Sequence, residues 1–322
     1  MPKNNNLKPK QFPQVIRFNE EPSTEFCNNL ASIKVQLLNA PSIEELKEYL
    51  PGFVKATWID HPALLDDMSS LGRDRIVRQV FFGKTLPTAQ ETIGLVWFID
   101  GISIQEVTHI LRYRGASFSA DCSADKWWTH KRGLVPNAIE ESPEFYARYM
   151  SLVEETKKLY CDMIDSREIS ILDARYILPR CLETFYYMRM NLRDTLHFIN
   201  QRIDKQIQPE TDNVIAYQMY LELLRNYPIA NGLIDIHKPA MHYISQARSD
   251  DSSNIYPPDK DSDIFEWNEK DFLYSKTRDK MNGTPSNAYN LFNAYLEDVE
   301  SKIKLIEKSN IAYLGYDPKQ LD

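Results

Sequence analysis

The chain has 322 residues and a net charge of −8, and its apolar (43%) and charged (26%) fractions are typical of a folded globular protein. An acidic protein does not coat nucleic acid or an anionic membrane through its overall charge, so we expect neither polymeric nucleic acid nor a membrane as a partner.

The four cysteines are widely spaced and form no Cys-x-x-Cys pair, which argues against a zinc site and a disulfide framework. The six histidines show no ligand spacing, so we expect no metal site. No apolar run approaches ~20 residues, and the basic N-terminus lacks the apolar core of a signal peptide. These features indicate a cytoplasmic protein.

Apolar patterns predict a strand, two helices and a second, buried strand in the first hundred residues, at 33–40, 42–51, 71–82 and 92–99. The spacing of Ser42 and Glu45 is that of a capping box, which starts the first of these helices. We expect that helix to end near Pro51, because proline has no N–H to continue the helical hydrogen bonds. Asp100 and Gly101 are expected to turn the chain after the buried strand.

Ser103 and Glu106 form a second capping box, followed by an apolar helix face at Ile104, Val107, Ile110 and Leu111. That helix leads into an expected loop at 112–128. Further helices are predicted at 141–166, after Pro179 as far as 203, at 215–227 and from Pro285 to Ile306, with a short element at 240–247 and a polar loop or linker at 248–284.

The stretch 174–203 attracts particular interest because it combines an apolar stripe with regularly spaced cations. As a helix it would align Phe185, Met188, Leu192, Leu196, Ile199 and Ile203. Arg189, Arg193 and His197 recur every four residues beside that stripe, which suits an anionic ligand such as a nucleotide phosphate. A solvated basic edge is the alternative. The chain carries no P-loop, no GxGxxG, no HExxH and no nucleophile elbow.

Two arginine-bearing segments together resemble the flavin-dependent thymidylate synthases. The first is Arg112-Tyr113-Arg114-Gly115-Ala116-Ser117, which is similar to the family's Arg-His-Arg signature followed by a serine. The second runs from Ala174-Arg175 and Leu178-Pro179 through Asn191-Leu192-Arg193, His197-Phe198 and Arg202 to Gln208-Pro209-Glu210. A fixed order of many positions is far more specific than one short motif.

The resemblance covers residues 32–232 and leaves 1–31 as a flexible N-terminal arm and 233–322 as a C-terminal extension of unknown role. It implies an α+β fold, with a central, mostly antiparallel sheet flanked by long helices and a helical C-terminal extension. It also implies a homotetramer with sites at subunit interfaces. Such enzymes bind FAD and dUMP, take a methylene from methylenetetrahydrofolate, reduce it with NADPH and make dTMP, and the reduced flavin passes the carbon to position five of the uracil.

Carried over position by position, the resemblance implies roles for individual residues. Arg202 would be catalytic, because a guanidinium beside the pyrimidine stabilises negative charge on the ring. The cofactor-binding residues would be Arg112, Arg114, Asn191, Arg193 and His197. The substrate-binding residues would be Arg112, Ser117, Asp121, Cys122, Ser123, Arg175 and Arg202.

The loop at 118–125 departs from the family pattern. Where the family has an arginine that meets the substrate phosphate, this chain has Ala124 or Asp125, depending on the register. Lys126, Lys131 or Arg132 would have to compensate. The altered loop leaves open a non-standard acceptor or product, such as methylation of UMP or hydroxymethylation of dUMP or dCMP. A catalytically silent scaffold that binds flavin or nucleotide is an alternative of another class.

Overall fold

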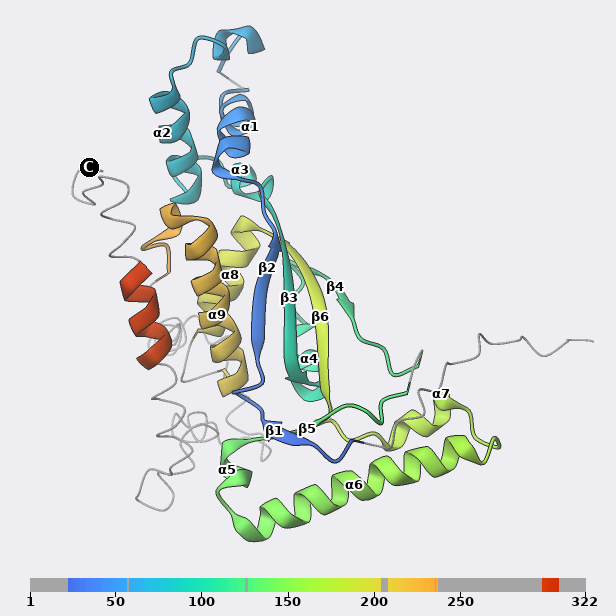
Figure 1. Ribbon diagram of the computed structural model, residues 1–322. Coiled ribbons are helices and arrows are strands. Elements are labelled where there is room, and N and C mark those ends of the chain that lie inside the picture. The colour runs from blue at the N-terminus through green and yellow to red at the C-terminus, as the bar shows by residue number, and fades with distance from the viewer. Residues whose placement is uncertain are drawn as a thin grey trace, which may run out of the picture.

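The computed structural model describes residues 23–56, 58–124, 127–203, 208–234, 236 and 297–306. Its centre is a four-stranded antiparallel sheet with the strand order β2-β3-β6-β4 (Figure 1). The strands are β2 (Lys34–Asn39), β3 (Gly94–Ser103), β6 (Glu183–Asn191) and β4 (Ser117–Ala120). The helices α8 (Leu192–Arg202) and α9 (Glu210–Asn226) lie along one face of this sheet. The predicted α+β fold with a mainly antiparallel sheet is therefore confirmed.

The remaining elements lie at the two ends of the sheet (Figure 1). At one end are α1 (Ile43–Lys55), η1 (Pro62–Leu65), α2 (Ser70–Phe81) and α3 (Pro87–Glu91). At the other end are β1 (Phe26–Asn28), which pairs in parallel with β5 (Gly133–Val135), and the helices α5 (Asn137–Glu140), α6 (Pro143–Asp165) and α7 (Ile171–Ala174). The short elements α4 (Ile104–Ile110), η2 (Arg175–Ile177) and η3 (Pro228–Ala230) complete the order.

The prediction of one helix from Pro179 to 203 is wrong in its first half, where the chain forms strand β6. Burial along β6 alternates, with Thr184, Tyr186, Met188 and Met190 buried and the residues between them facing outward. This alternation is typical of a strand. It places Phe185 and Met188 on opposite faces of the sheet, whereas the predicted helix had placed them on the same face. Consecutive aromatic residues are compatible with the period of a helix and with that of a strand. The segment forms a strand because it pairs with the whole length of β3.

Two further predictions, a turn at Asp100-Gly101 and a helix end near Pro51, are wrong. The chain does not turn at Asp100; β3 continues to Ser103 through a bulge at Gly101 (φ 72°). A Cβ at Gly101 would lie 1.9 Å from the carbonyl oxygen of Ser32, so the sheet edge requires glycine there.

Helix α1 also continues past its predicted end at Pro51, as far as Lys55. Pro51 cannot donate to the Lys47 carbonyl, four residues earlier, and Arg73 on α2 donates to it instead, at 3.1 Å. A second helix thus satisfies the carbonyl that the proline leaves unpaired.

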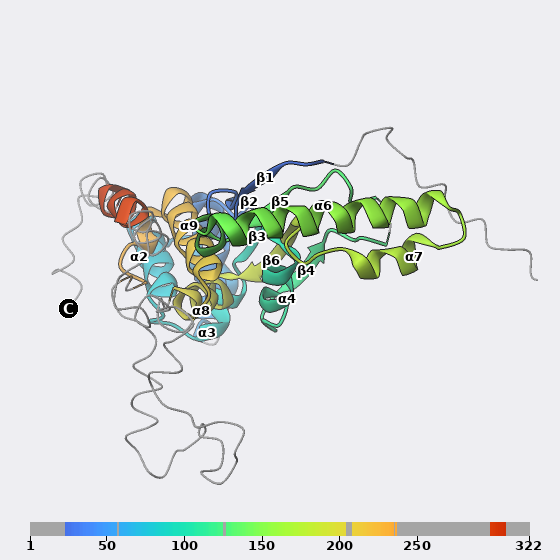
Figure 2. The same cartoon turned by 90° about the horizontal axis from the view of Figure 1, so that it is seen from below.

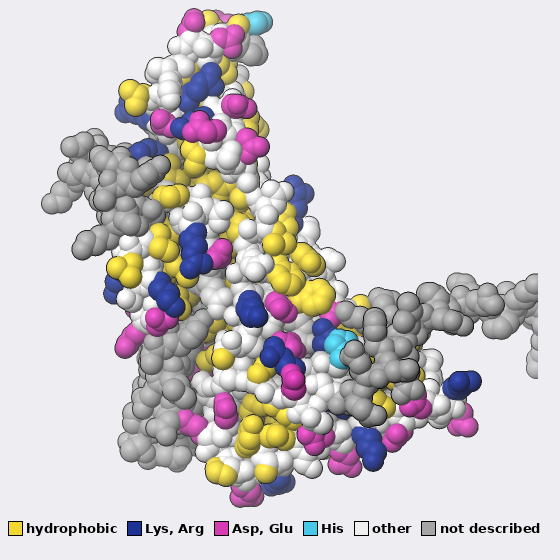
Figure 3. Space-filling view, in the orientation of Figure 1, with side chains coloured by type: hydrophobic (Ala, Val, Ile, Leu, Met, Phe, Trp, Pro, Cys, Tyr) yellow, Lys and Arg dark blue, Asp and Glu magenta, His cyan; other side chains and the backbone are white. Residues whose placement is uncertain are grey.

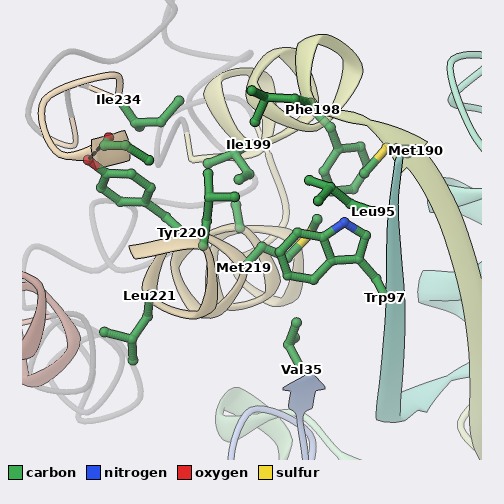
Figure 4. Packing of buried hydrophobic residues seen from close by; sticks show 14 of the residues in the cluster. Val35, Leu95, Trp97, Met190, Phe198, Ile199, Met219, Tyr220, Leu221 and Ile234 are labelled. Carbon is green, nitrogen blue, oxygen red and sulfur yellow. Dashed lines mark hydrogen bonds between the residues drawn. The ribbon is translucent and has the colours of Figure 1, made fainter. Parts of the chain in front are cut away.

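The main core lies between the sheet and α9, whose residues are buried on nearly all sides (Figure 4). Trp97 and Leu95 of β3 point toward Met219 of α9 and toward Phe198 of α8. Residues 297–306 are helical, as predicted, and bury Val299 and Ile303 against the same core. The predicted short element at 240–247, the linker at 248–284 and the start of the last helix at Pro285 lie outside the described residues.

Helix α6 extends from the body as an arm, with α7 at its outer end (Figures 1 and 2). The predicted helix at 141–166 is confirmed, but its apolar side is only partly buried. Val153 and Tyr160 are buried, whereas Phe145, Leu152 and Leu159 are 59%, 62% and 41% exposed. Among the described residues, no helix is long and apolar enough to cross a membrane.

Candidate functional site

Tyr113 joins the two arginine-bearing segments that the sequence separates by about eighty residues. Its hydroxyl donates to the main-chain oxygen of Asp194 at 2.9 Å, and its ring packs edge-on against Phe198. Gly115 permits the close approach, since a Cβ there would lie 2.7 Å from Oδ1 of Asp194. The segment 112–117 therefore lies against the first turns of α8. Tyr113 stands where the family signature has a histidine, and the tyrosine has a structural role here.

Exposed cations surround this junction. The side chains of Arg112, Arg114 and Arg189 are exposed and form no hydrogen bond or ion pair with any described residue. His197 is exposed as well, and its ring lies 6.1 Å from that of Tyr113. Three guanidinium groups without a carboxylate partner in the described part of the chain are a suitable environment for an anionic ligand. Tyr113, between Arg112 and Arg114 in the chain, thus lies near His197; a cofactor role for these residues stays a prediction.

Two other predicted cofactor residues have partners within the protein. Asn191 is the N-cap of α8: its side-chain oxygen accepts from the Asp194 amide, and its amide group donates to the Asp194 carboxylate, both at 2.8 Å. Arg193 forms an ion pair with Glu91 of α3 and remains about half exposed. Both residues lie at the start of α8, where the exposed cations gather.

Arg202 ends α8 in a buried polar cluster that three helices build. Its Nη1 donates to Oδ2 of Asp212 in the first turn of α9, at 2.6 Å, and to the Gln208 side-chain oxygen at 3.1 Å. The side chain of Asp212 is 1% exposed and that of Arg202 10%. His109, in the last turn of α4, adds Nδ1 at 3.0 Å from the same oxygen of Asp212. These contacts hold the guanidinium in one position. Its Nε is buried and forms no hydrogen bond with the described residues.

Sequence reasoning missed His109 and Asp212 as members of this cluster. Of the six histidines only His197 was given a role, and Asp212 stood in no motif. The position of His109, one helical turn before Arg112, was the available signal. Glu106, one turn earlier on α4, belongs to the same electrostatic environment: burial raises the pKa of its carboxyl, with a smaller contribution from Asp212.

The altered loop contains paired groups instead of a free cation. The carboxylate of Asp121 is 2% exposed and lies 2.6 Å from Nζ of Lys131. Arg132 forms an ion pair with Glu183, and Lys126 lies outside the described residues. The two described cations that could have replaced the missing arginine are therefore each neutralised by a carboxylate.

The other loop residues predicted to bind substrate take different positions. Ser117 opens β4 and is exposed opposite Arg189 of β6, so this stretch is not the plain loop that was predicted at 112–128. Cys122 is exposed and its sulfur accepts from the Ala124 amide at 3.4 Å, while Ser123 is half-buried. Asp121 faces Lys131, whereas Ser117 and Cys122 remain accessible to a ligand.

Arg175 does not join the Arg202 cluster within one chain. It begins η2, directly after α7, and its Nε donates to the Leu172 carbonyl oxygen at 3.1 Å. Helix α7 lies at the outer end of the α6 arm, whereas α8 lies on the body (Figures 1 and 2). Among the described residues, no group of histidine, cysteine, aspartate and glutamate side chains has the geometry of a metal site.

Strand β6 of the antiparallel sheet leads directly into helix α8, which carries Arg193 and Arg202. Solved structures share this fold. A solved UMP/dUMP methylase, PolB from Streptomyces cacaoi bound with 5-Br dUMP, has the same fold, with a TM-score of 0.51 and 15% sequence identity. The match covers 65% of this chain and 96% of that one. The family model of the Thymidylate synthase complementing protein matches residues 53–229, more than half of the chain, and the protein belongs to that family.

Curated relatives agree with this assignment. The flavin-dependent thymidylate synthases of Pyrococcus furiosus and Thermococcus onnurineus are 29% and 32% identical to the chain over 131 and 136 residues. These matches cover 39% and 41% of this chain and 53% and 55% of the relatives. That of Geobacter sulfurreducens is 26% identical over 172 residues. The chain thus spans about half the length of the first two relatives it matches.

Proposed function

We propose that the protein transfers a one-carbon unit from methylenetetrahydrofolate to carbon 5 of a uracil nucleotide, with FAD and NADPH, and converts dUMP to dTMP. The observation that carries the proposal is the fixed Arg202 guanidinium. Asp212 and Gln208 hold Nη1 and Nε is buried, so the N–H groups of Nη2 are the remaining donors of this rigid, planar group, and no described residue engages them. A pyrimidine edge, with its carbonyl and imide groups, matches such donors.

Arg202 would act on the electronic state of the uracil ring. Carbon 5 becomes nucleophilic when negative charge develops on the ring oxygens, and a preorganised guanidinium in a buried site stabilises that charge. The ion pair with Asp212 holds the group in position before the reaction, so little reorganisation is needed. Arg202 is in this way both the catalytic residue and a contact to the substrate.

The exposed cations beside α8 fit a polyanionic cofactor. Arg112, Arg114 and His197 would hold the FAD phosphates, because these cations are exposed and no described carboxylate neutralises the two arginines. Asn191 and Arg193 would line the edge of the same pocket at the start of α8. Bound flavin supplies the redox chemistry, and the protein binds and orients it.

The substrate contacts would come from both sides of the junction. Ser117 is exposed at the start of β4, and Cys122 is exposed on the altered loop, with Asp121 and Ser123 beside it. Arg112 precedes this strand in the chain. Arg175 would add a cation to the nucleotide phosphate. Since Arg175 and Arg202 lie on separate parts of one chain, we propose that a second subunit supplies Arg175.

A homotetramer would meet that requirement. Helix α6 presents Phe145, Leu152 and Leu159 at intervals of seven residues, all exposed. The outer face of the sheet presents a second apolar surface: Phe98, Phe185 and Tyr187 contact one another, with ring centroids 4.9–6.2 Å apart. Figure 3 shows hydrophobic side chains gathered over these strands. Burying both surfaces against further copies of the chain would bring the arm of one subunit to the body of another.

Mixing two inactive variants tests the shared site. Arg175→Ala and Arg202→Ala should each abolish turnover. If each site takes Arg175 from one subunit and Arg202 from another, tetramers reassembled from both variants contain some sites with both arginines and regain activity. Reassembly of each variant with itself is the control. Mixed tetramers that stay inactive would overturn the shared site.

The activity itself is tested on the purified protein. A yellow preparation that releases FAD on denaturation, and that methylates dUMP in the presence of methylenetetrahydrofolate and NADPH, is the expected result. Omission of NADPH is the control. A colourless protein that does not take up added FAD would overturn the proposal. Flavin and nucleotide binding without turnover would instead support the silent scaffold.

The altered loop favours a test of other acceptors. Among the described residues, Lys131 and Arg132 are each paired with a carboxylate, so neither replaces the family's arginine, and a different nucleotide is a specific alternative. UMP, dUMP and dCMP should be incubated in parallel and their products identified by mass, which separates methyl from hydroxymethyl products. A product from UMP or dCMP but none from dUMP would replace dTMP synthesis by that alternative.

A further inference from the structure

His109 shares the carboxylate of Asp212 with the proposed catalytic arginine. Its Nδ1 lies 3.0 Å from Oδ2 of Asp212, and Nη1 of Arg202 lies 2.6 Å from the same oxygen. The three groups come from α4, α8 and α9, so the tertiary structure alone brings them together. The Asp212 side chain is 1% exposed whereas that of His109 is 38% exposed. The histidine is thus the most exposed of these three side chains.

The contact with Asp212 favours one tautomer of His109. An ionised carboxylate can only accept, so Nδ1, 3.0 Å from Oδ2 of Asp212, avoids repulsion when it carries the ring hydrogen. In the neutral ring Nε2 then carries the lone pair, and it lies 3.4 Å from Nη1 of Arg202. A carboxylate that orients a histidine in this way also stabilises the imidazolium that forms when Nε2 takes a proton.

Of the groups around the cluster, His109 is the one suited to accept a proton from a ligand. On its own helix, the Glu106 carboxylate accepts from the Ser103 amide at 2.9 Å and caps α4. On α8 and beyond, Arg202 and Gln208 are cationic or neutral and cannot take a proton at neutral pH. On β6, Tyr186 is fully buried and uncharged, because burial raises the pKa of its phenol well above the usual value.

The chemistry of uracil requires a base within reach of the hydrogen on carbon 5. When carbon 5 has gained the new carbon–carbon bond, its hydrogen must leave as a proton, and the electron pair of the C–H bond returns to the ring system. Carbon 5 and the carbonyl at carbon 4 are neighbours on the ring. A base beside Arg202 is therefore close to carbon 5 when Arg202 contacts this carbonyl, and Nδ1 and Nε2 of His109 lie 3.2 and 3.4 Å from Nη1 of Arg202.

We propose that Nε2 of His109 takes the proton from carbon 5 of the uracil nucleotide, with Asp212 as the positioning residue that fixes its tautomer. The inference rests on the proposed function and adds to it the residue that carries the proton. One C–H bond breaks, one N–H bond forms, and the proton later passes to solvent through the exposed edge of the ring.

The test measures release of the carbon-5 hydrogen directly. FAD-loaded protein, with methylenetetrahydrofolate and NADPH, is given dUMP labelled with tritium at carbon 5, and the tritium released to water is counted. His109→Gln retains a donor to Asp212 but cannot carry a proton. It should slow release by about 10²- to 10⁴-fold, the usual contribution of a general base. Flavin content and the Kd for dUMP should stay within twofold of wild type.

An isotope effect separates the chemical role from a structural one. With deuterium at carbon 5, His109→Gln should show a larger isotope effect than wild type, because proton removal becomes rate-limiting. Asp212→Asn should raise the isotope effect too, while Asp212→Glu should restore most of the rate. The matched control is His61→Gln, since His61 lies at η1 and its Nδ1 accepts from the Ala63 amide. It should leave all values unchanged.

The outcomes distinguish this inference from the proposed function. Active wild-type protein and His109→Gln within threefold of its rate would overturn the role of His109 alone. A slowed variant with an unchanged isotope effect would overturn it as well, because His109 would then act on another step. Wild-type protein that binds no dUMP and releases no tritium would overturn the proposed function, and this inference with it.

Discussion

Nη1 of Arg202 and Oδ2 of Asp212 lie 2.6 Å apart in an ion pair whose two side chains are almost completely buried. The pair connects the end of α8 to the start of α9 and leaves the guanidinium in one orientation. Asn213 supports the same connection, because its side-chain amide donates to the Arg202 carbonyl oxygen at 2.7 Å. A buried charge that loses its partner is costly, so the pair dominates the energetics of this region.

Removing one member should therefore destabilise the protein strongly. Arg202→Met should lower the free energy of unfolding by about 3–5 kcal/mol, because Asp212 remains charged and buried without its partner. The double variant Arg202→Met/Asp212→Leu should regain most of that loss and remain inactive. Urea unfolding measures both. The exposed pair Lys302–Asp298 is the control, and Lys302→Met should change the stability by less than about 1 kcal/mol. A double variant no more stable than the single one would contradict this account.

Tyr113→Phe should loosen the segment 112–117 from α8. The loss of the hydrogen bond to Asp194 should cost about 0.5–1.5 kcal/mol and weaken FAD binding, as measured by thermal unfolding and flavin fluorescence. Burial, with a contribution from Asp194, raises the pKa of Tyr113 from 10 to about 12.

That pKa predicts how the effect of Tyr113→Phe depends on pH. A phenol whose folded-state pKa is raised stabilises the fold fully below pH 10, and this stability is lost between pH 10 and pH 12, because the unfolded chain ionises first. The difference between wild type and variant should therefore be constant from pH 7 to pH 10 and shrink above it. A stability difference between wild type and Tyr113→Phe that grows above pH 10 would contradict the raised pKa of Tyr113.

Arg73 and Pro51 should be energetically coupled. Arg73 donates to the Lys47 carbonyl that Pro51 leaves unpaired, and to the Leu65 carbonyl at 2.8 Å. Arg73→Met should cost about 1–3 kcal/mol by leaving these acceptors unsatisfied. In a Pro51→Ala background the helix supplies its own N–H to Lys47, so the same substitution should cost less. Equal costs in the two backgrounds, measured by urea unfolding, would show that the carbonyl does not depend on Arg73.

Leu152→Glu should break the proposed assembly without unfolding the subunit. Its side chain is 62% exposed in the single chain, so the substitution should change subunit stability by roughly 0.5 kcal/mol or less. A buried glutamate at a subunit interface would be unfavourable, and sedimentation should show species smaller than a tetramer. Glu155→Gln, exposed on the same helix, is the control. A variant that sediments as wild type would exclude Leu152 from the interface.

Local signals in the sequence were sufficient for several elements. The capping boxes at Ser42 and Ser103 correctly started α1 and α4, because a cap depends on side chains three residues apart. The run 92–99 correctly indicated a buried strand. The order of Arg112, Arg193 and Arg202 was enough to recognise the family, since it requires no knowledge of contacts.

Contacts between distant residues decided the rest. The strand β6 was mistaken for a helix because its aromatic residues fit both periods until β3 pairs with them. Helix α1 passes Pro51 because an arginine from α2 satisfies the freed carbonyl. Neither effect is visible in the segment that it changes, because the partner lies elsewhere in the chain.

The sequence by itself determined which cations the candidate site contains, and the tertiary structure decided what each of them can do. Packing gave Arg202 a buried carboxylate and a neighbouring histidine, placed Lys131 in an ion pair with Asp121, and left Arg112 and Arg114 exposed without a described partner. The physical reason is that the behaviour of a charge depends on its burial and on its nearest opposite charge, and only the folded chain fixes both.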